Sequence, residues 1–325
     1  MPKGVAVESS PAVSGQPAEG STLKRYASRL VDLRILGLIT VFATYGLIVL
    51  GGVVRATDSG TACPDWPLCH GQVIPPAETK VLIEFSHRLV ASLVGFMILG
   101  MVLQVWRLYR PRAAMKWAAV ATVFLLALQV IVGGITVGTE TAAGVVAIHL
   151  SIALMLISLL IFIVASAWTE ERPSLSSLAP VSVLGLAGVY VVIILGAFVS
   201  QTDAGLAYPD WPLFDGRLVP ADSQAGILHY VHRVVAGLVG VVVAGALVVA
   251  VRRRASSPIV WGLAAACVAY VAQSLFGAAN IWLDLATWVR IVHLALASAV
   301  WAMLVSSVVW AMTRPQHAYG DSELG

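Results

Sequence analysis

Long apolar stretches dominate this sequence and restrict what it can fold into. Eight of them run for roughly 20 residues each, enough for a helix to cross a hydrocarbon core of about 30 Å. A chain inside a bilayer must satisfy its backbone hydrogen bonds internally, and helices do so. The sequence therefore predicts an all-α integral membrane protein with eight transmembrane helices. The predicted spans lie near residues 35–54, 84–106, 117–137, 144–168, 180–200, 228–251, 259–281 and 289–312.

Composition supports a membrane protein and excludes other classes. Hydrophobic residues make up 59% of the chain and charged residues only 11%, and the mean hydropathy is +0.88. These values lie outside the range of soluble globular domains. No basic patch is interleaved with aromatic residues, so the sequence gives no support for nucleic-acid binding. The lipid bilayer is the expected surrounding of the chain.

The placement of positive charge predicts the orientation. Lysine and arginine cluster before the first span, between the second and third, between the sixth and seventh, and after the last. The positive-inside rule therefore places both termini in the cytoplasm and the long loops 55–83 and 201–227 on the outer side of the plasma membrane. Residues 1–30 are rich in Ser, Pro, Ala and Gly and predict a disordered cytoplasmic tail. A second short cytoplasmic tail is expected at 315–325.

An internal repeat divides the spans into two sets. The sequence Pro-Asp-Trp-Pro-Leu begins at Pro64 and again at Pro209, an offset of 145 residues. The correspondence continues into the later helices, where the offset becomes 144 and pairs Gln129 with Gln273. Each half contains an even number of helices, so the copies have the same orientation. We expect two tandem parallel four-helix bundles, residues 31–170 and 171–314, related by pseudo-two-fold symmetry.

Histidines recur at matching positions of the two halves. They lie near the outer ends of the second, fourth, sixth and eighth spans, and an intramembrane imidazole indicates a functional site. Two imidazoles from facing helices in apolar surroundings suit a haem, whereas zinc or copper usually needs three or four ligands. The natural pairs lie within each half, and pairing across the halves stays open. These histidines are His87, His149, His232 and His293.

The first half carries an acid that the second half lacks. Glu84 precedes His87 by three residues, on the same helical face, and its counterpart in the second half is His229. A carboxyl group at the edge of a haem pocket can relay protons or stabilise developing positive charge, which favours a catalytic role. The alternative is an ion pair with Arg88, four residues further along. Placement in only one half favours catalysis.

The outer loops differ as well. Cys63 and Cys69 stand where the second half has Tyr208 and Phe214. An oxidising exterior permits a Cys63–Cys69 disulfide, which either staples the loop or takes part in electron transfer.

Two arginines are candidates for contacts with haem propionates. Arg88 and Arg233 each follow a histidine directly, and a guanidinium group can hold a carboxylate through two hydrogen bonds. Arginines that extend from the helix toward the membrane surface are the alternative. The matched glutamines, Gln129 and Gln273, are expected to form hydrogen bonds between helices.

Several motifs together resemble one family. They are Thr57-Asp58-Ser59-Gly60, Cys63-Pro64-Asp65-Trp66-Pro67-Leu68-Cys69-His70-Gly71 and Glu84-Phe85-Ser86-His87-Arg88. With the duplication and the recurring histidines, they resemble haem A synthases of the bacterial, cysteine-containing type, from about residue 30 to 312. The resemblance implies an enzyme that oxidises the C8 methyl group of haem O to a formyl group, giving haem A for terminal oxidases. Relatives with a second cysteine pair differ from this chain at Tyr208 and Phe214.

The resemblance also implies roles for individual residues. His87 and His149 would hold the substrate haem, with Glu84 in the active site, and His232 and His293 would ligate a haem b cofactor. Haem O synthase, a farnesyltransferase, and a membrane electron acceptor or donor are the implied partners, and a homo-oligomer is compatible with it. A non-catalytic dihaem b-type electron carrier is the main rival, but it gives no reason for Glu84 to occur in one half. A transporter is weaker, because the repeats are parallel and no helix is broken at the bilayer midplane.

Overall fold

The computed structural model describes residues 32–169, 180–219 and 224–313. This part of the chain is helical, with eight helices long and apolar enough to cross a membrane and a single turn of 3₁₀-helix in the second long loop. The expected tails at 1–30 and 315–325 lie outside the described residues. The helices are α2 (Leu33–Ala56), α3 (Thr79–Leu108), α4 (Ala113–Gly138), α5 (Ala143–Ala167), α6 (Pro180–Gln201), α7 (Gln224–Arg252), α8 (Ser257–Trp282) and α9 (Thr287–Thr313), with η2 (Ala204–Leu206) after α6.

Each predicted span corresponds to one of these helices, and most helices extend beyond the apolar stretch. The second of the eight helices shows this best, because α3 begins at Thr79 and ends at Leu108, whereas its apolar stretch covers 84–106. Polar residues such as Lys80 continue the helix where hydrophobicity no longer marks it, since lysine is a good helix former. The histidines consequently lie well inside their helices rather than at the ends.

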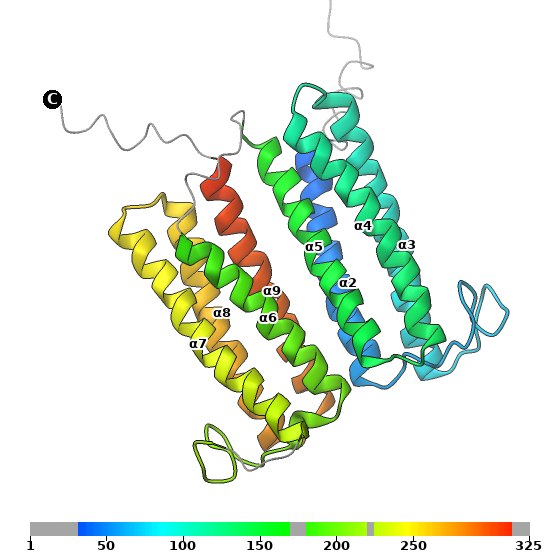
Figure 1. Ribbon diagram of the computed structural model, residues 1–325. Coiled ribbons are helices and arrows are strands. Elements are labelled where there is room, and N and C mark those ends of the chain that lie inside the picture. Colours follow the sequence, from blue (N-terminus) through cyan, green and yellow to red (C-terminus); the bar gives the residue numbers. More distant parts are fainter. Residues whose placement is uncertain (1–31, 170–179, 220–223, 314–325) are drawn as a thin grey trace, which may run out of the picture.

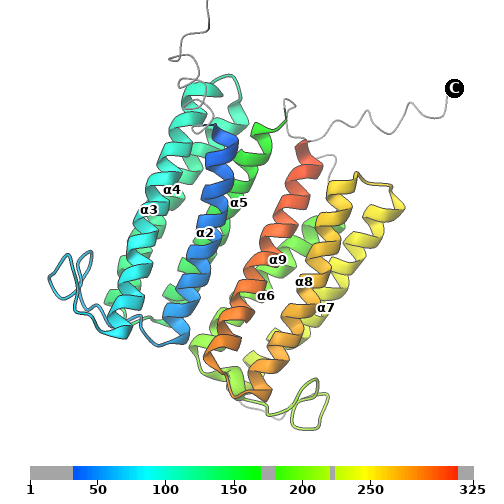
Figure 2. The same cartoon turned by 180° about the vertical axis from the view of Figure 1, so that it is seen from behind.

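The helices form two groups that lie side by side (Figure 1). Helices α2 to α5 make one group and α6 to α9 the other, and the long loops 57–78 and 202–219 extend from the same end. The start of α2 and the end of α9 lie at the opposite end in both views (Figures 1 and 2). This placement is the one that an even number of spans in each half requires. The pseudo-two-fold relation and the boundary between the halves remain predictions.

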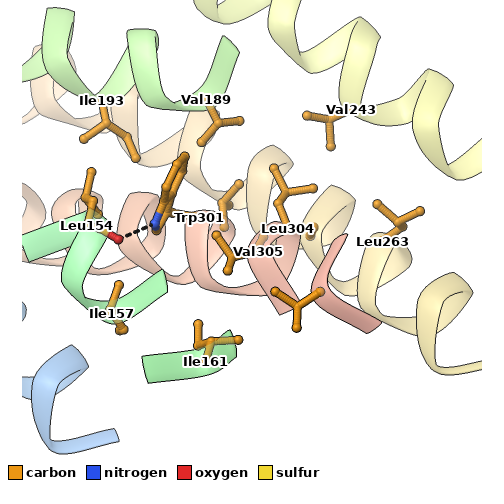
Figure 3. Close-up of a cluster of buried hydrophobic side chains, with 14 of the residues drawn as sticks. Leu154, Ile157, Ile161, Val189, Ile193, Val243, Leu263, Trp301, Leu304 and Val305 are labelled. Carbon is orange, nitrogen blue, oxygen red and sulfur yellow. Dashed lines mark hydrogen bonds between the residues drawn. The ribbon is translucent and has the colours of Figure 1, made fainter. Parts of the chain in front are cut away.

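The two groups meet through α2, α5, α6 and α9. Figure 3 shows part of this contact, where Leu154, Ile157 and Ile161 of α5 face residues of α6 and α9. The Trp301 indole Nε1 lies 3.0 Å from both the Leu154 carbonyl oxygen and the Ser158 hydroxyl of α5. Lipid is as apolar as these side chains, so close packing and interhelical hydrogen bonds hold the groups together.

A small residue allows the closest approach at this contact. A Cβ atom built on Gly52 of α2 would lie only 2.6 Å from a methyl carbon of Leu294 on α9. The glycine therefore lets the two backbones come nearer than any larger residue would. A hydrogen bond also joins α2 and α9, because the Tyr45 hydroxyl donates to the Ala295 carbonyl at 3.0 Å. The described halves thus form one packed unit.

Candidate functional site

The histidines from the repeat lie on α3, α5, α7 and α9. Each follows the start of its helix by six to eight residues, which at a rise of 1.5 Å per residue is about 9 to 12 Å along the axis. All four of these helices begin at the end of the molecule that carries the long loops (Figure 1). The four imidazoles therefore occupy similar depths near one face.

The structure brings the histidines together in pairs within each half. His87 lies close enough to His149 for an electrostatic interaction, and so does His293 to His232. Their residues are partly buried. Within the described residues, the Nδ1 atom of each of the four rings is buried without a hydrogen bond of ordinary geometry. Backbone carbonyls of Val192 and Gln273 lie near the rings of the second half.

Each histidine ring rests against a glycine of the preceding helix. A Cβ atom on the glycine would approach the ring carbon Cε1 to 3.2 Å at His87, His149 and His293 and to 3.0 Å at His232. Such contacts are tighter than nearly all real Cβ contacts, so the glycines make room for the rings. These glycines are Gly51 on α2, Gly133 on α4, Gly196 on α6 and Gly277 on α8. The four glycines recur at the repeat offset, and this recurrence is the sequence signal that could have identified them.

Glutamine side chains complete the contacts of one histidine in each half. The Gln129 side-chain nitrogen lies 3.1 Å from Nε2 of His149, and that of Gln273 lies 3.2 Å from Nε2 of His293. This confirms the expected hydrogen bonds between helices. An axial ligand presents a ring nitrogen to iron; in His149 and His293, Nε2 has a glutamine partner and Nδ1 has none among the described residues. The paired rings, the buried ring nitrogens and the glycine contacts fit a bis-histidine haem site in each half.

Glu84 binds the loop that contains Cys63 and Cys69, called here the disulfide loop. Its carboxylate pairs with the Arg88 guanidinium at 2.5 Å and accepts a hydrogen bond from the Cys63 backbone N–H at 2.8 Å. Only 5% of the Glu84 side chain is exposed. The ion pair that the sequence offered as an alternative is therefore present, together with a contact to Cys63 that the sequence did not indicate. Both carboxylate oxygens are occupied, one turn before His87 on the same helix.

Arg88 and Arg233 bind the loops that precede their helices. Arg88 donates to the carbonyls of Asp65, Leu68 and Cys63. In the second half, Arg233 donates from Nη1 to the carbonyls of Asp210 and Leu213, at 2.9 and 3.0 Å. Its Nε donates to the His229 ring at 2.9 Å, in the place that Glu84 occupies in the first half. Their expected contact with propionates remains a prediction.

The structure contains the expected disulfide between Cys63 and Cys69. Both cysteines are fully buried against Val81 of α3, next to Phe85. In the second half, Tyr208 and Phe214 replace the cysteines with an edge-to-face ring pair whose centroids lie 5.3 Å apart. The two loops thus share a backbone arrangement and differ in the bond that closes it.

An aspartate at the centre of each repeated motif organises the loop. Asp65 accepts hydrogen bonds from the backbone N–H groups of His70 and Gly71, and Asp210 accepts from Asp215 and Gly216. The pKa of Asp65 lies below its usual range, mainly because the Gly71 N–H donates to the carboxylate. The Gly216 N–H lowers the pKa of Asp210 in the same way. Gly71 and Gly216 have φ of 68° and 72°, which explains a glycine at the turn.

These hydrogen bonds predict how the loops respond to acid. A carboxylate whose pKa is lowered by folding stabilises the loop above its unfolded pKa of about 3.9, and this contribution is lost as pH falls through the lower folded value. We expect hydrogen–deuterium exchange at Gly71 to show constant protection above about pH 4 and falling protection below it. Asp65→Asn should lower the protection at neutral pH and remove the acid transition. An unchanged transition in this variant would contradict the assignment.

Comparison with known proteins places the chain in a family. The profile of COX15-CtaA, described as cytochrome oxidase assembly protein, matches residues 34–305. The chain belongs to the COX15-CtaA family. A Heme A synthase of Geobacillus thermodenitrificans is 31% identical over 90% of this chain and 96% of its own length. A Heme A synthase of Geobacillus kaustophilus is 31% identical over 84% and 89%, and one of Staphylococcus aureus is 29% identical over 81% and 89%.

Proposed function

We propose that this chain is a haem A synthase, a membrane oxidoreductase that converts the C8 methyl group of haem O to a formyl group. The observation that carries the proposal is the pair of histidine sites with unequal surroundings. The sites match in their rings, glycines and glutamines, while among the described residues only the first has a buried carboxylate and a disulfide beside it. The names of the relatives agree with this reading. The eight apolar helices make the chain a multi-pass membrane protein.

In this proposal the two sites have different occupants. His87 and His149 hold haem O as substrate, and His232 and His293 hold haem b. The electrostatic contact within each pair supports pairing inside a half rather than across the halves. When bound, haem b supplies an acceptor for single electrons close to the substrate. The duplicated architecture would then set two haems side by side near the outer face, and not one above the other across the bilayer.

The first half supplies the groups that handle protons. When water supplies the added oxygen atom, oxidation of a methyl to a formyl group releases electrons and protons in equal number. Glu84 is the buried carboxylate next to this site, and Arg88 and the Cys63 N–H bind its two oxygens. A carboxylate so placed can accept released protons and orient water. A haem b held by His232 and His293 would supply a carrier for these electrons toward a membrane electron acceptor.

Location and partners follow from the same reaction. The enzyme lies in the bacterial plasma membrane with both termini in the cytoplasm and both haem sites near the outer face. A haem O synthase supplies haem O to the enzyme. Haem O enters from the lipid phase because its farnesyl chain is apolar. The product serves terminal oxidases.

Pigment analysis tests the proposed function. The full-length chain is co-expressed with a haem O synthase in a host that makes no haem A, and extracted haems are separated by chromatography. We expect haem A to appear and haem O to decline in comparison with cells that carry the synthase alone. A purified protein that shows a Soret band but yields no haem A would instead support the dihaem electron carrier.

A further inference from the structure

A second pair of arginines lies at the junction of the two halves. Arg55 is in the last turn of α2, and its Nη2 donates to the Ser200 carbonyl of α6 at 3.0 Å. Arg290 is in the first turn of α9, and its Nη1 donates to the Ala56 carbonyl of α2 at 3.3 Å. The two guanidinium groups are close enough to repel each other. Residues 235 positions apart thus meet at the end of the molecule that carries the loops.

Neither arginine is repeated in the other half. The offset of 145 residues places Ser200 opposite Arg55, and the offset of 144 places Arg290 opposite Val146. Most polar residues around the histidines do recur, including Arg88 and Arg233. The position of Arg290 is also unfavourable for its helix, because a cation near a helix N-terminus opposes the macrodipole. A requirement other than helix stability must therefore account for these arginines.

Each arginine lies one helical turn outward from a histidine site. Arg55 follows Gly51 by four residues, and Gly51 is the glycine against which the His87 ring rests. Arg290 precedes His293 by three residues. Residues three or four apart share a helix face, so Arg55 lies beside the first site and Arg290 beside the second. Together they bridge the two sites on the outer side.

The acidic side chains near Arg55 and Arg290 do not engage all the donors of the two guanidinium groups. Arg55 pairs with Asp58 at 3.0 Å, but the Asp58 side chain is 70% exposed, and exposed ion pairs contribute little. The Nε of Arg55 is buried and lacks a hydrogen bond within the described residues. Asp203 is the other acid near Arg290. Donors therefore remain for an anionic group that comes from outside the chain.

We propose that Arg55 and Arg290 bind carboxylate groups of the haems, Arg55 at the first site and Arg290 at the second. This proposal rests on the haem sites of the proposed function and assigns their propionate partners. Both Nη atoms of Arg88, which the sequence offered for this role, donate to loop carbonyls, and Nη2 also contacts Glu84. In Arg233, Nη1 donates to loop carbonyls and Nε to the His229 ring, and Nη2 alone is without a hydrogen bond among the described residues. A carboxylate at each guanidinium would also bring the polar edges of the two haems toward each other at the junction.

Binding of an esterified haem tests this assignment. The full-length chain, produced without haem, is titrated in detergent with haemin and with haemin dimethyl ester, which lacks the carboxylate charge. Wild-type protein should bind the ester about ten- to a hundredfold more weakly than haemin, as expected for loss of a charge-assisted hydrogen bond. Arg55→Gln and Arg290→Gln should each weaken binding of haemin while leaving binding of the ester unchanged. Arg290→Lys should recover part of the haemin affinity, and Arg217→Gln in the outer loop should change neither titration.

The outcomes separate this proposal from the proposed function. Equal binding of haemin and its ester by wild-type protein would overturn the propionate assignment and leave the haem sites intact. If Arg290→Gln weakened the binding of haemin and of its ester equally, the arginine would only join α2 to α9. That result would also overturn the propionate assignment. Folded wild-type protein that binds neither compound would overturn the proposed function itself. The reduction potential gives a second readout. Loss of a nearby cation should lower the reduction potential of the haem that stays bound in the Arg55→Gln or Arg290→Gln variant.

Discussion

Replacement of Glu84 with alanine should reduce the conversion of haem O to haem A by a factor of about 10² to 10⁴, the usual contribution of a positioned acid or base. The carboxylate lies beside the proposed substrate site, and the structure leaves no second carboxylate among the described residues to replace it there. The ratio of haem A to haem O in extracted pigment measures the effect. It must be normalised to the amount of folded protein, because removal of one partner of a buried ion pair costs about 3–5 kcal/mol.

The second half of the chain provides the matched control. There His229 accepts a hydrogen bond from Arg233 at 2.9 Å, in the position that Glu84 has toward Arg88. Glu84→His copies this pairing, so it should preserve the attachment of the loop while removing the carboxylate. A catalytic Glu84 predicts that Glu84→His folds, retains its haem and remains inactive. Normal conversion in this variant would show that Glu84 serves only to hold Arg88 and the Cys63 loop.

Loss of a histidine should affect the two haems unequally. His232→Ala or His293→Ala removes one of two axial ligands from the proposed cofactor site, so the haem b that copurifies with the protein should fall by at least about tenfold, which requires a loss of only ~1.4 kcal/mol. His87→Ala or His149→Ala should leave this haem in place and remove chiefly haem O and haem A. Chromatography of haems extracted from the purified variants measures both pools.

A histidine outside the helices controls for general damage. His70 lies in the disulfide loop, where its ring contacts the Ala62 carbonyl at 3.0 Å, and His70→Ala should retain the full content of haem b. If His87→Ala abolished haem b and His232→Ala spared it, the assignments of the two halves would be reversed. Loss of both haems in every variant would instead indicate that the sites fold together.

Sequence periodicity and composition predicted the fold well because the bilayer allows few alternatives. A stretch such as 117–137 can cross lipid only as a helix, and the structure has α4 over Ala113–Gly138. The predicted helix ends were less accurate, because hydrophobicity marks the thickness of the lipid and not the end of a hydrogen-bonded helix. Thr79 and Lys80 belong to α3 although they lie outside its apolar stretch. The disulfide between Cys63 and Cys69 was also expected correctly.

The candidate site was predictable in its residues but not in its contacts. The repeat identified the four histidines because it compares positions within one chain. It could not show that Glu84 reaches back to Cys63, since that hydrogen bond depends on how the loop folds over α3. For the same reason it could not show that Arg88 donates to the carbonyls of Asp65 and Leu68. Side chains at a loop junction are positioned by tertiary structure, which periodicity does not describe.

The contact between each histidine ring and a glycine has a consequence for how a haem would bind. Because the helix backbones enclose the rings, as at His232 and Gly196, their orientations are fixed by the packing of the bundle before any ligand arrives. A preorganised site loses little conformational entropy on binding, so more of the coordination energy appears as affinity. The same rigidity makes the site intolerant of small changes. One added methyl group on the neighbouring helix would force the histidine ring to shift by a few tenths of an ångström, without any change to the histidine itself.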